Sequence, residues 1–254
     1  MSDFMRPENI AIVLNSPRYP ENIGAAARAA RNMGIARVIV VSPENYDLEK
    51  IMKLATHAAR DIVENIEVYE DLKSAIGSYN YIAGTTARIG GQRSTITSPS
   101  KLARQLVSIS QNNRIAILFG PEDRGLTNED IRYCHTLVNI PSADFSSLNL
   151  AQAVMIICYE IHKVCKIPPD NFFPRLATRH ELDGMYEQLK DLLVKINYIN
   201  PENPDYWMNK IRHFFSRFPL RAMEVSIIRG VCRQVGWYEK KCYRDGEKNA
   251  GGLT

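Results

Sequence analysis

The stretch IAIVLNSPRYPENIGAAARAARNMGIARVIVVS, residues 10–42, decides the fold. It opens with the short apolar run IAIVLN (10–15) and closes with a second one, ARVIVVS (36–42). Between them, ENIGAAARAARNMG (21–34) has the composition of a helix, and Gly34 suits the position just beyond the helix end. Two near-continuous apolar runs separated by a helix are typical of parallel strands that are buried on both faces.

The same alternation continues to residue 165. Further apolar runs predict strands, and the segments between them have helical spacing. The strands are expected at 79–86, 115–120 and 136–141, and the helices near 50–61, 69–77, 98–110, 127–134 and 148–165. We therefore expect an α/β domain over residues 1–165, with a parallel sheet and helices on both faces. Such sheets bind ligands at the carboxyl ends of their strands.

The remainder of the chain is organised differently. Residues 166–179 contain three prolines and no periodicity, which predicts a linker. Residues 180–244 are amphipathic and predict a small all-helical domain. The last residues, 245–254, are expected to be a disordered tail.

Composition excludes several classes of protein. The 254 residues are 45% hydrophobic and 24% charged, without an apolar run long enough for a membrane span or signal peptide, so a cytoplasmic protein is expected. None of the five cysteines forms a C-x-x-C pair, and the histidines are scattered. Reduced buried thiols are therefore favoured over disulfides, and no metal site is expected.

The net charge of +4 is concentrated in the C-terminal part. Residues 1–165 hold 17 basic and 17 acidic side chains, whereas residues 206–244 hold nine basic and two acidic ones. A basic segment beside a neutral domain indicates contact with a polyanion. A solvated helical face is the alternative.

Polar residues follow the predicted strands. Asn22 and Arg28 begin the alanine-rich helix, where an arginine is well placed to bind an anion, although a surface arginine is the plainer interpretation. Glu122 follows the strand expected at 115–120. It could be a site carboxylate, or it could form an ion pair with Arg124 at the surface. Thr127 and Asp130 have the spacing of a capping box.

The stretch DFSSLNLAQAVMI (144–156) is a more polar helix start than capping requires. Ser146, Ser147 or Asn149 could cap the helix, and one cap needs only one of them. Ser147 lacks the G-x-S-x-G setting of a hydrolase nucleophile. The G-x-G-x-x-G pattern of nicotinamide-binding enzymes is also missing, which disfavours that class.

Taken together, NIGAAAR (22–28), LFGPEDRGLTNE (118–129) and IPSADFSSLNLAQAV (140–154) resemble the three motifs of SPOUT-class RNA ribose 2′-O-methyltransferases. The resemblance is closest to the bacterial tRNA methyltransferases of the TrmJ type and extends through the C-terminal helices. It implies a C-terminal trefoil knot in the α/β domain, S-adenosylmethionine as cofactor, tRNA as partner of the helical domain, and a homodimer.

The resemblance also implies the site residues. The catalytic residues would be Asn22, Arg28, Glu122, Ser147 and Asn149, and Arg28 and Arg88 would bind the substrate. The cofactor would lie against Ala83, Gly84, Thr85, Gly120, Ile140, Ser147, Leu148 and Asn149.

The implied reaction is methylation of a ribose 2′-hydroxyl in tRNA, at cytidine or uridine 32 of the anticodon loop. Methylation of ribosomal RNA or of another tRNA position is the alternative, and a non-catalytic RNA-binding relative is a further one.

Overall fold

The computed structural model describes residues 4–87, 96–143, 148–215 and 218–250, except for the side chains of residues 239 and 242–250. The chain divides into two compact units, Met1–Leu176 and Ala177–Thr254, and each is described by itself. No helix in these ranges combines the length and the apolar character that a membrane crossing requires.

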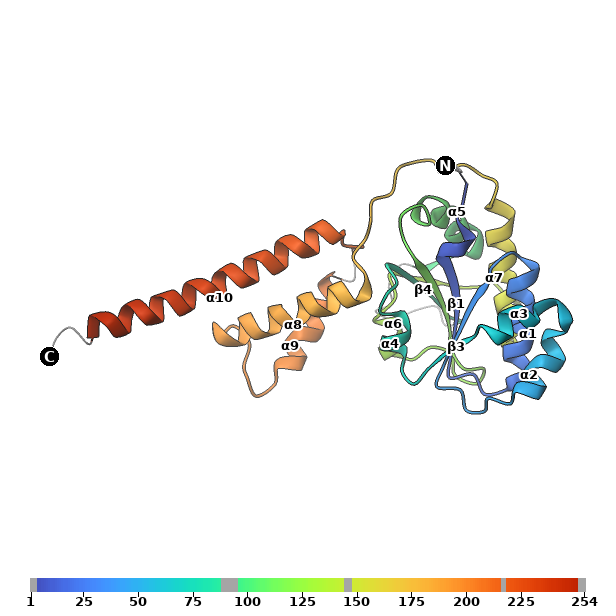
Figure 1. The fold of residues 1–254 in the computed structure, drawn as a ribbon, viewed down its shortest axis with the longest axis horizontal. Coiled ribbons are helices and arrows are strands. Elements are labelled where there is room, and N and C mark those ends of the chain that lie inside the picture. Colours follow the sequence, from blue (N-terminus) through green and yellow to red (C-terminus); the bar gives the residue numbers. More distant parts are fainter. Residues whose placement is uncertain (1–3, 88–95, 144–147, 216–217, 251–254) are drawn as a thin grey trace. The chain divides into compact units, whose positions relative to one another are not determined.

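Unit 1 is built on a seven-stranded sheet in which every recorded strand pair is parallel (Figure 1). The order across the sheet is β3-β2-β1-β6-β4-β7-β5. The strands are β1 (Ile10–Asn15), β2 (Arg37–Val41), β3 (Glu67–Tyr69), β4 (Tyr81–Thr85), β5 (Ile96–Thr97), β6 (Ile115–Phe119) and β7 (Thr136–Val138).

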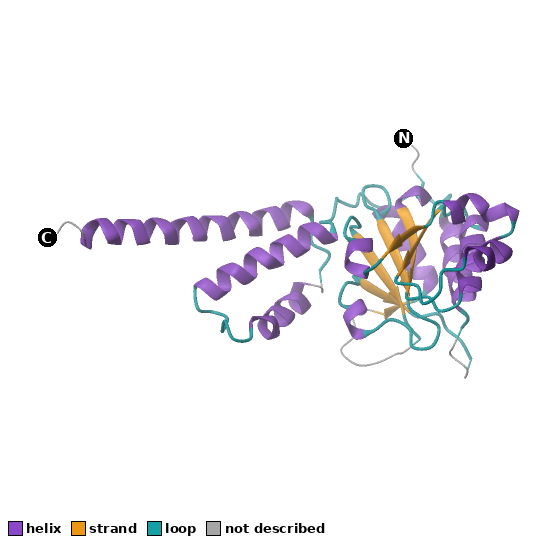
Figure 2. Ribbon diagram, turned by 60° about the horizontal axis from the view of Figure 1, so that its bottom comes forward, coloured by secondary structure: helices purple, strands orange, loops and turns teal. Residues whose placement is uncertain are grey.

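Helices cover both faces of this sheet (Figure 2), which confirms the predicted fold class. The first face carries α1 (Pro20–Asn32), α2 (Leu48–Ala55), α3 (Arg60–Glu64), α5 (Pro99–Ile109) and α7 (Leu150–Val164), and the second carries α4 (Leu72–Ile76) and α6 (Asn128–Ile131). Two short 3-10 turns lie at Pro7–Asn9 and His57–Ala59.

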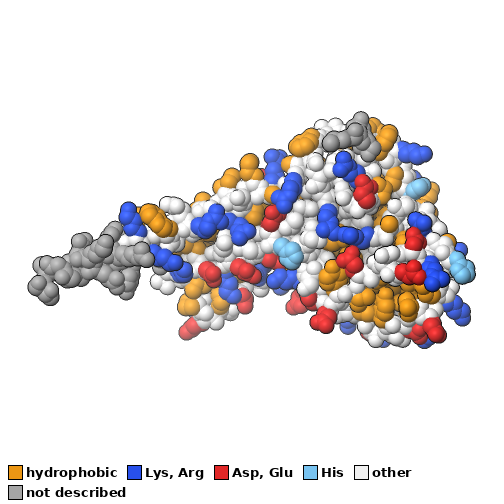
Figure 3. Space-filling model, in the orientation of Figure 1, with side chains coloured by type: hydrophobic (Ala, Val, Ile, Leu, Met, Phe, Trp, Pro, Cys, Tyr) orange, Lys and Arg blue, Asp and Glu red, His pale blue; other side chains and the backbone are white. Residues whose placement is uncertain are grey.

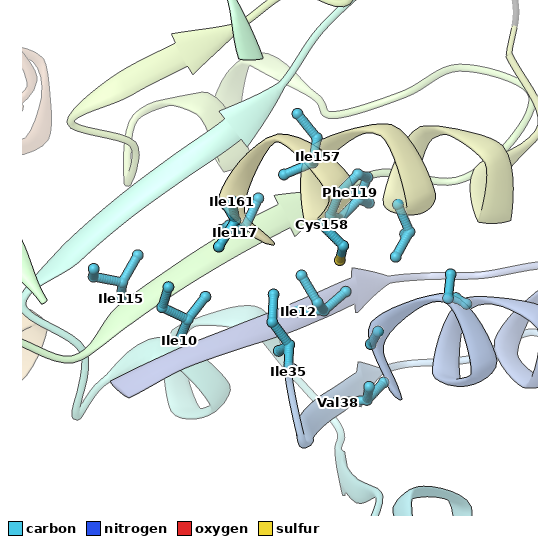
Figure 4. Packing of buried hydrophobic residues seen from close by; sticks show 14 of the residues in the cluster. Ile10, Ile12, Ile35, Val38, Ile115, Ile117, Phe119, Ile157, Cys158 and Ile161 are labelled. Atoms are coloured by element: carbon cyan, nitrogen blue, oxygen red, sulfur yellow. The ribbon is translucent and has the colours of Figure 1, made fainter. Parts of the chain in front are cut away.

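The alternation of side chains along each strand explains why the apolar runs are continuous. In β1, Ile10, Ile12 and Leu14 belong to the core under α1 and α7, whereas Ala11 and Val13 belong to the core on the other face. Figure 4 shows the larger core, in which isoleucines of β1 and β6 meet side chains of α7. A strand that is buried on both faces has no side exposed to solvent, so its residues are apolar at nearly every position.

The structure differs from the sequence-based expectation in short elements. The strands β3 and β5 were not expected, because three and two residues are too few to show a pattern. The single helix expected at 50–61 is broken at Thr56, whose φ of 60° is incompatible with a right-handed helix. The element at 127–134 contains one short helix, α6, with the capping box of Thr127 and Asp130 as predicted.

Unit 2 contains α8 (Arg179–Lys195), α9 (Pro204–Phe215) and α10 (Ala222–Ala250) around a small apolar core. Because α10 continues to Ala250, the predicted disordered tail is helical over residues 245–250. No proline interrupts that stretch, and the single Gly246 costs a helix only about 1 kcal/mol.

The segment expected as a linker, 166–179, contains no helix before α8 starts at Arg179. Leu176, the last residue of this segment that belongs to unit 1, is nevertheless fixed there. The backbone of Leu176 donates its N–H to Asn113 Oδ1 at 2.7 Å and accepts from Asn80 Nδ2 at 2.8 Å, and all three residues are buried.

Candidate functional site

The polar residues singled out in the sequence lie at the carboxyl edge of the sheet. Strand β6 lies between β1 and β4, and β4 lies between β6 and β7. Because all four strands are parallel, the segments that follow them emerge at the same edge. The N-terminus of α1, the loop with Glu122 and the start of α7 therefore meet there.

A chain of hydrogen bonds joins the three motifs. Asn22 Nδ2 of α1 donates to Glu122 Oε1 at 2.6 Å, and Asn149 Nδ2 donates to Asn22 Oδ1 at 2.9 Å. Asn149 is also the N-cap of α7, because its Oδ1 accepts from the N–H groups of Ala151 and Gln152. Of the three residues that could cap this helix, Asn149 is the cap, and the same side chain is an expected site residue. We call Asn22, Glu122 and Asn149 the amide frame.

The second oxygen of Glu122 is held by a residue that the sequence did not indicate. Arg18 donates its backbone N–H to Glu122 Oε2 at 3.0 Å. Its side chain forms ion pairs with Glu44 and Asp123, both at 3.1 Å, and the hydrogen bond and charge of Glu44, followed by the charge of Asp123, raise the pKa of Arg18. Arg18 thereby connects the loops after β1, β2 and β6. The expected alternative, in which Glu122 pairs with Arg124, is not seen among the described contacts.

Arg28 is separate from the amide frame. It lies six residues after Asn22, which is about 9 Å along a helix. Its side chain is exposed, and no described residue forms a hydrogen bond or ion pair with it. Arg31, one turn further, is instead paired with Asp61 at 3.4 Å. Arg28 therefore presents an unpaired cation among the described residues, and Glu122 fixes Asn22 and not Arg28.

The residues expected to hold a cofactor lie at the carboxyl end of β4 or in the segments that follow β6 and β7. Thr85 donates its hydroxyl to the carbonyl of Leu118 at 3.0 Å, and Asn139 Nδ2 donates to the carbonyl of Thr86 at 2.9 Å, so these strand ends are bound to one another. Of the other expected cofactor residues, Ile140 and Leu148 are half-buried and Ala83 is fully buried.

The two glycines of this region are required by the protein's own packing. A Cβ on Gly120 would lie 2.3 Å from the backbone of Gly125 and Leu126, and one on Gly84 would lie 2.6 Å from Cys134 Sγ. Both glycines let a neighbouring loop pack against its strand. Only backbone groups remain at these two positions for contact with a ligand.

Two expected site residues, Arg88 and Ser147, lie outside the described residues. Within the described ranges, no three His, Cys, Asp or Glu side chains are grouped so that they could hold a metal ion.

The fold is that of a family of RNA methyltransferases. Residues 9–159 match the SpoU rRNA methylase family, and the chain therefore belongs to this family. Residues 180–247 match the C-terminal domain of the tRNA methyltransferase TrmJ, which confirms the narrower resemblance. The trefoil knot stays a prediction.

Relatives support the same assignment over most of the chain. The tRNA (cytidine/uridine/adenosine-2′-O-)-methyltransferase TrmJ of Pseudomonas aeruginosa is 32% identical over 238 residues, which cover 88% of this chain and 92% of the relative. The corresponding cytidine/uridine enzyme of Klebsiella pneumoniae is 30% identical over 90% of this chain and 96% of the relative. The crystal structure of TrmJ from Z. mobilis superimposes with a TM-score of 0.77 at 29% identity and covers 89% of this chain and 98% of that chain.

Proposed function

We propose that this protein transfers a methyl group from S-adenosylmethionine to a ribose 2′-hydroxyl in tRNA, at cytidine or uridine 32 of the anticodon loop. The observation that carries the proposal is the amide frame, which brings one polar residue from each of the three motifs together at the ligand-binding edge of the sheet. The names of the Pseudomonas and Klebsiella relatives support tRNA and these bases. The position rests on the resemblance alone.

The strand ends after β4, β6 and β7 fit S-adenosylmethionine. Half-buried Ile140 and Leu148 offer apolar contact for an adenine ring, and the backbone at Thr85 and Gly120 offers hydrogen-bonding groups. When bound, the cofactor supplies a methyl carbon on a positively charged sulfur. The chain must then orient the ribose hydroxyl and stabilise the negative charge that develops on its oxygen.

Arg28 supplies that stabilisation in our proposal. A guanidinium keeps its proton at neutral pH, so it acts as an electrostatic partner and not as a base. Its side chain is exposed and has no ion-pair partner in the described part of the chain, which suits a contact with the phosphate beside the reacting ribose and with the forming alkoxide. The ribose proton leaves through that phosphate or through water.

The amide frame has a positioning role. Both ends of the Asn22 amide are engaged, and Asn149 uses its oxygen for the α7 cap, so each keeps one amide hydrogen for the ribose. In the same proposal Ser147 helps to orient the ribose and Arg88 binds the RNA backbone.

A homodimer is part of the proposal. On α7, Tyr159 is half-exposed and Ile156 is half-buried, whereas Val154, Ile157 and Ile161 are already in the core. Ile156 and Tyr159 offer an apolar surface for a second copy of the chain. Sedimentation of the wild-type chain and of Tyr159→Asp tests this part. A monomeric wild type contradicts it.

Methyl transfer from labelled S-adenosylmethionine to unmodified bulk tRNA, compared with ribosomal RNA, tests the function. We expect incorporation into tRNA, and mass spectrometry of nuclease fragments should place a 2′-O-methyl group at nucleotide 32. Incorporation only into ribosomal RNA would favour the alternative substrate. Binding of S-adenosylmethionine without transfer to either RNA would favour a non-catalytic relative.

A pH–rate profile separates the roles of Arg28. We expect Arg28→Ala to lose at least a hundredfold in kcat, a typical loss for a group that stabilises a developing oxyanion. Arg28→Lys should retain part of the activity with an unchanged profile. Arg31→Ala is the matched control, because Arg31 is exposed on the same helix but paired with Asp61. An ionisation near neutral pH that disappears in Arg28→Lys would show that Arg28 acts as a base.

A further inference from the structure

Unit 2 contains a groove between α8 and α10 that the proposed reaction does not use. Its volume is about 300 Å³, at the lower end of the range for small-ligand pockets. The lining residues are Gln188, Asp191, Leu192, Lys195, Cys232, Arg233, Gly236, Trp237 and Lys240. In Figure 3, Lys and Arg side chains are spread over the surface of this helical unit.

The groove has an excess of positive charge. Lys195, Arg233 and Lys240 line it together with one carboxylate, Asp191. None of the three cations forms an ion pair with a described side chain, whereas Lys190 on the neighbouring turn of α8 is paired with Asp205 at 2.9 Å. Three exposed cations that pair with no described side chain lie around one concave surface, and this arrangement favours an anionic occupant.

An aromatic ring lies beside these cations. Trp237 is 54% exposed, although it lines the groove. Leu192 and buried Cys232 provide the apolar part of the lining, and Lys241 lies 5.3 Å from the centre of the Trp237 ring. A positively charged groove with an exposed aromatic side chain is the arrangement by which proteins bind unpaired nucleotides, through stacking and phosphate contact.

Gly236 gives the groove its width. A Cβ built at this position has no atom within 4 Å, although Gly236 lies inside α10, where alanine would stabilise a helix more. The absent side chain leaves open space next to Trp237.

We propose that this groove binds one unpaired nucleotide of the tRNA, with the base against Trp237 and its phosphates against Lys195, Arg233 and Lys240. The proposal rests on tRNA as the substrate and adds a second contact point far along the sequence from the amide frame. A second copy of the chain is a poorer occupant, because a two-fold contact places a patch against itself and would bring these cations together. The volume suits one nucleotide and not a duplex.

Titration of labelled tRNA with the full-length chain at fixed salt concentration tests the proposal. Trp237→Ala should weaken binding by roughly five- to a hundredfold, the range for loss of one base–aromatic stack, and Trp237→Phe should recover most of it. Gly236→Leu should weaken binding similarly, because it fills the open space. The matched controls are Trp207→Ala, on α9, and Gly230→Leu, on α10, since neither residue lines the groove.

Fluorescence gives a second readout. With Trp207→Phe as background, Trp237 is the only tryptophan, and its emission should be quenched when tRNA binds. Unchanged binding by Trp237→Ala and Gly236→Leu, or unquenched emission, overturns the proposal. So does conversion of a dimer to a monomer by Trp237→Ala, because the groove would then be an interface between copies.

The two proposals fail in different ways. If the wild type neither binds nor methylates tRNA, the proposed function fails. If the wild type methylates tRNA and the groove variants bind it equally well, only the groove proposal fails.

Discussion

Asn22 is the central residue of the amide frame, because its amide nitrogen donates to Glu122 and its amide oxygen accepts from Asn149. The sequence could predict that Asn22, Glu122 and Asn149 lie close together, since each follows a buried strand of a parallel sheet. It could not predict which of them bond. Arg18 was missed because neither its spacing nor its neighbours distinguish it from a surface arginine, and its role depends on three loops that only the fold brings together.

Exchange of Glu122 for glutamine tests the frame. Glutamine keeps one acceptor for Asn22 but presents an NH₂ group where the backbone N–H of Arg18 now donates. We expect kcat to fall roughly ten- to a hundredfold, because a hydrogen bond to a charged group contributes about 1.5–3 kcal/mol. Steady-state methyl-transfer kinetics measure this effect.

Asp123→Asn is the matched control for Glu122→Gln. It removes the same charge from the adjacent residue and breaks only an exposed ion pair with Arg18, which contributes about 0–1 kcal/mol. Its kcat should stay within about fivefold of the wild type, consistent with that range. Equal losses in both variants would attribute the effect to net charge and not to the frame.

At the scale of elements, the sequence predicts the long helices and strands but not the short strands. Helices α1, α5 and α7 and strands β1, β2, β4 and β6 follow from apolar periodicity and caps. The strands β3 and β5 are fixed by pairing at the edges of the sheet, which no local pattern records. The close approach of α1 to α2 at Gly24 was also hidden, because no local pattern shows which helix packs at that position.

Two substitutions separate the cap of α7 from the frame. Aspartate is as good an N-cap as asparagine but cannot donate to Asn22. Asn149→Asp should therefore keep the unfolding midpoint near that of the wild type and lose activity. Asn149→Ala should lose activity and about 1 kcal/mol of stability. Urea unfolding and methyl transfer, measured together, check both; an active Asn149→Asp enzyme would contradict the role of the frame.

Two glycines in helices should respond to alanine with opposite signs. A Cβ at Gly24 in α1 would lie 2.0 Å from the carbonyl oxygen of Ile51 in α2, so Gly24→Ala should destabilise unit 1 by about 1–3 kcal/mol. Gly236→Ala, with open space around it, should stabilise α10 by about 0.5–1 kcal/mol. Thermal unfolding of the two variants measures both, and two shifts in the same direction would contradict this account.

At the scale of the whole molecule, buried thiols should set the alkaline limit of stability. Burial raises the pKa of Cys134, and it raises the pKa of Cys158 to about 12, whereas an unfolded thiol ionises near 9. Stability is thus full below about pH 9 and falls as the pH rises towards the folded pKa values, by about 1.4 kcal/mol per pH unit for each thiol.

Urea unfolding between pH 8 and 10.5 measures that slope. Cys158→Ala should reduce the slope by the contribution of one thiol. This comparison of slopes does not depend on how stable the variant is at pH 8. A slope that is unchanged in Cys158→Ala would show that other groups cause the alkaline loss.

The division into two units predicts separable binding. A chain ended after Leu176 keeps the contacts of that residue with Asn80 and Asn113 but loses the basic helices. We expect tRNA binding to weaken by at least tenfold with a shallower salt dependence, because phosphate contacts are lost. Binding of S-adenosylmethionine, measured by calorimetry, should stay within about threefold, a change of less than 1 kcal/mol. An equal loss of both would contradict the assignment of roles.

The hydrogen bonds of the amide frame span 100 and 127 positions of the chain. Asn22 is synthesised before its partner Glu122, and Asn149 is synthesised after both. A nascent chain therefore has no frame until the start of α7 has emerged and has folded back beside α1. On the proposed role of the frame, a nascent chain therefore gains methylation activity only after this step of synthesis.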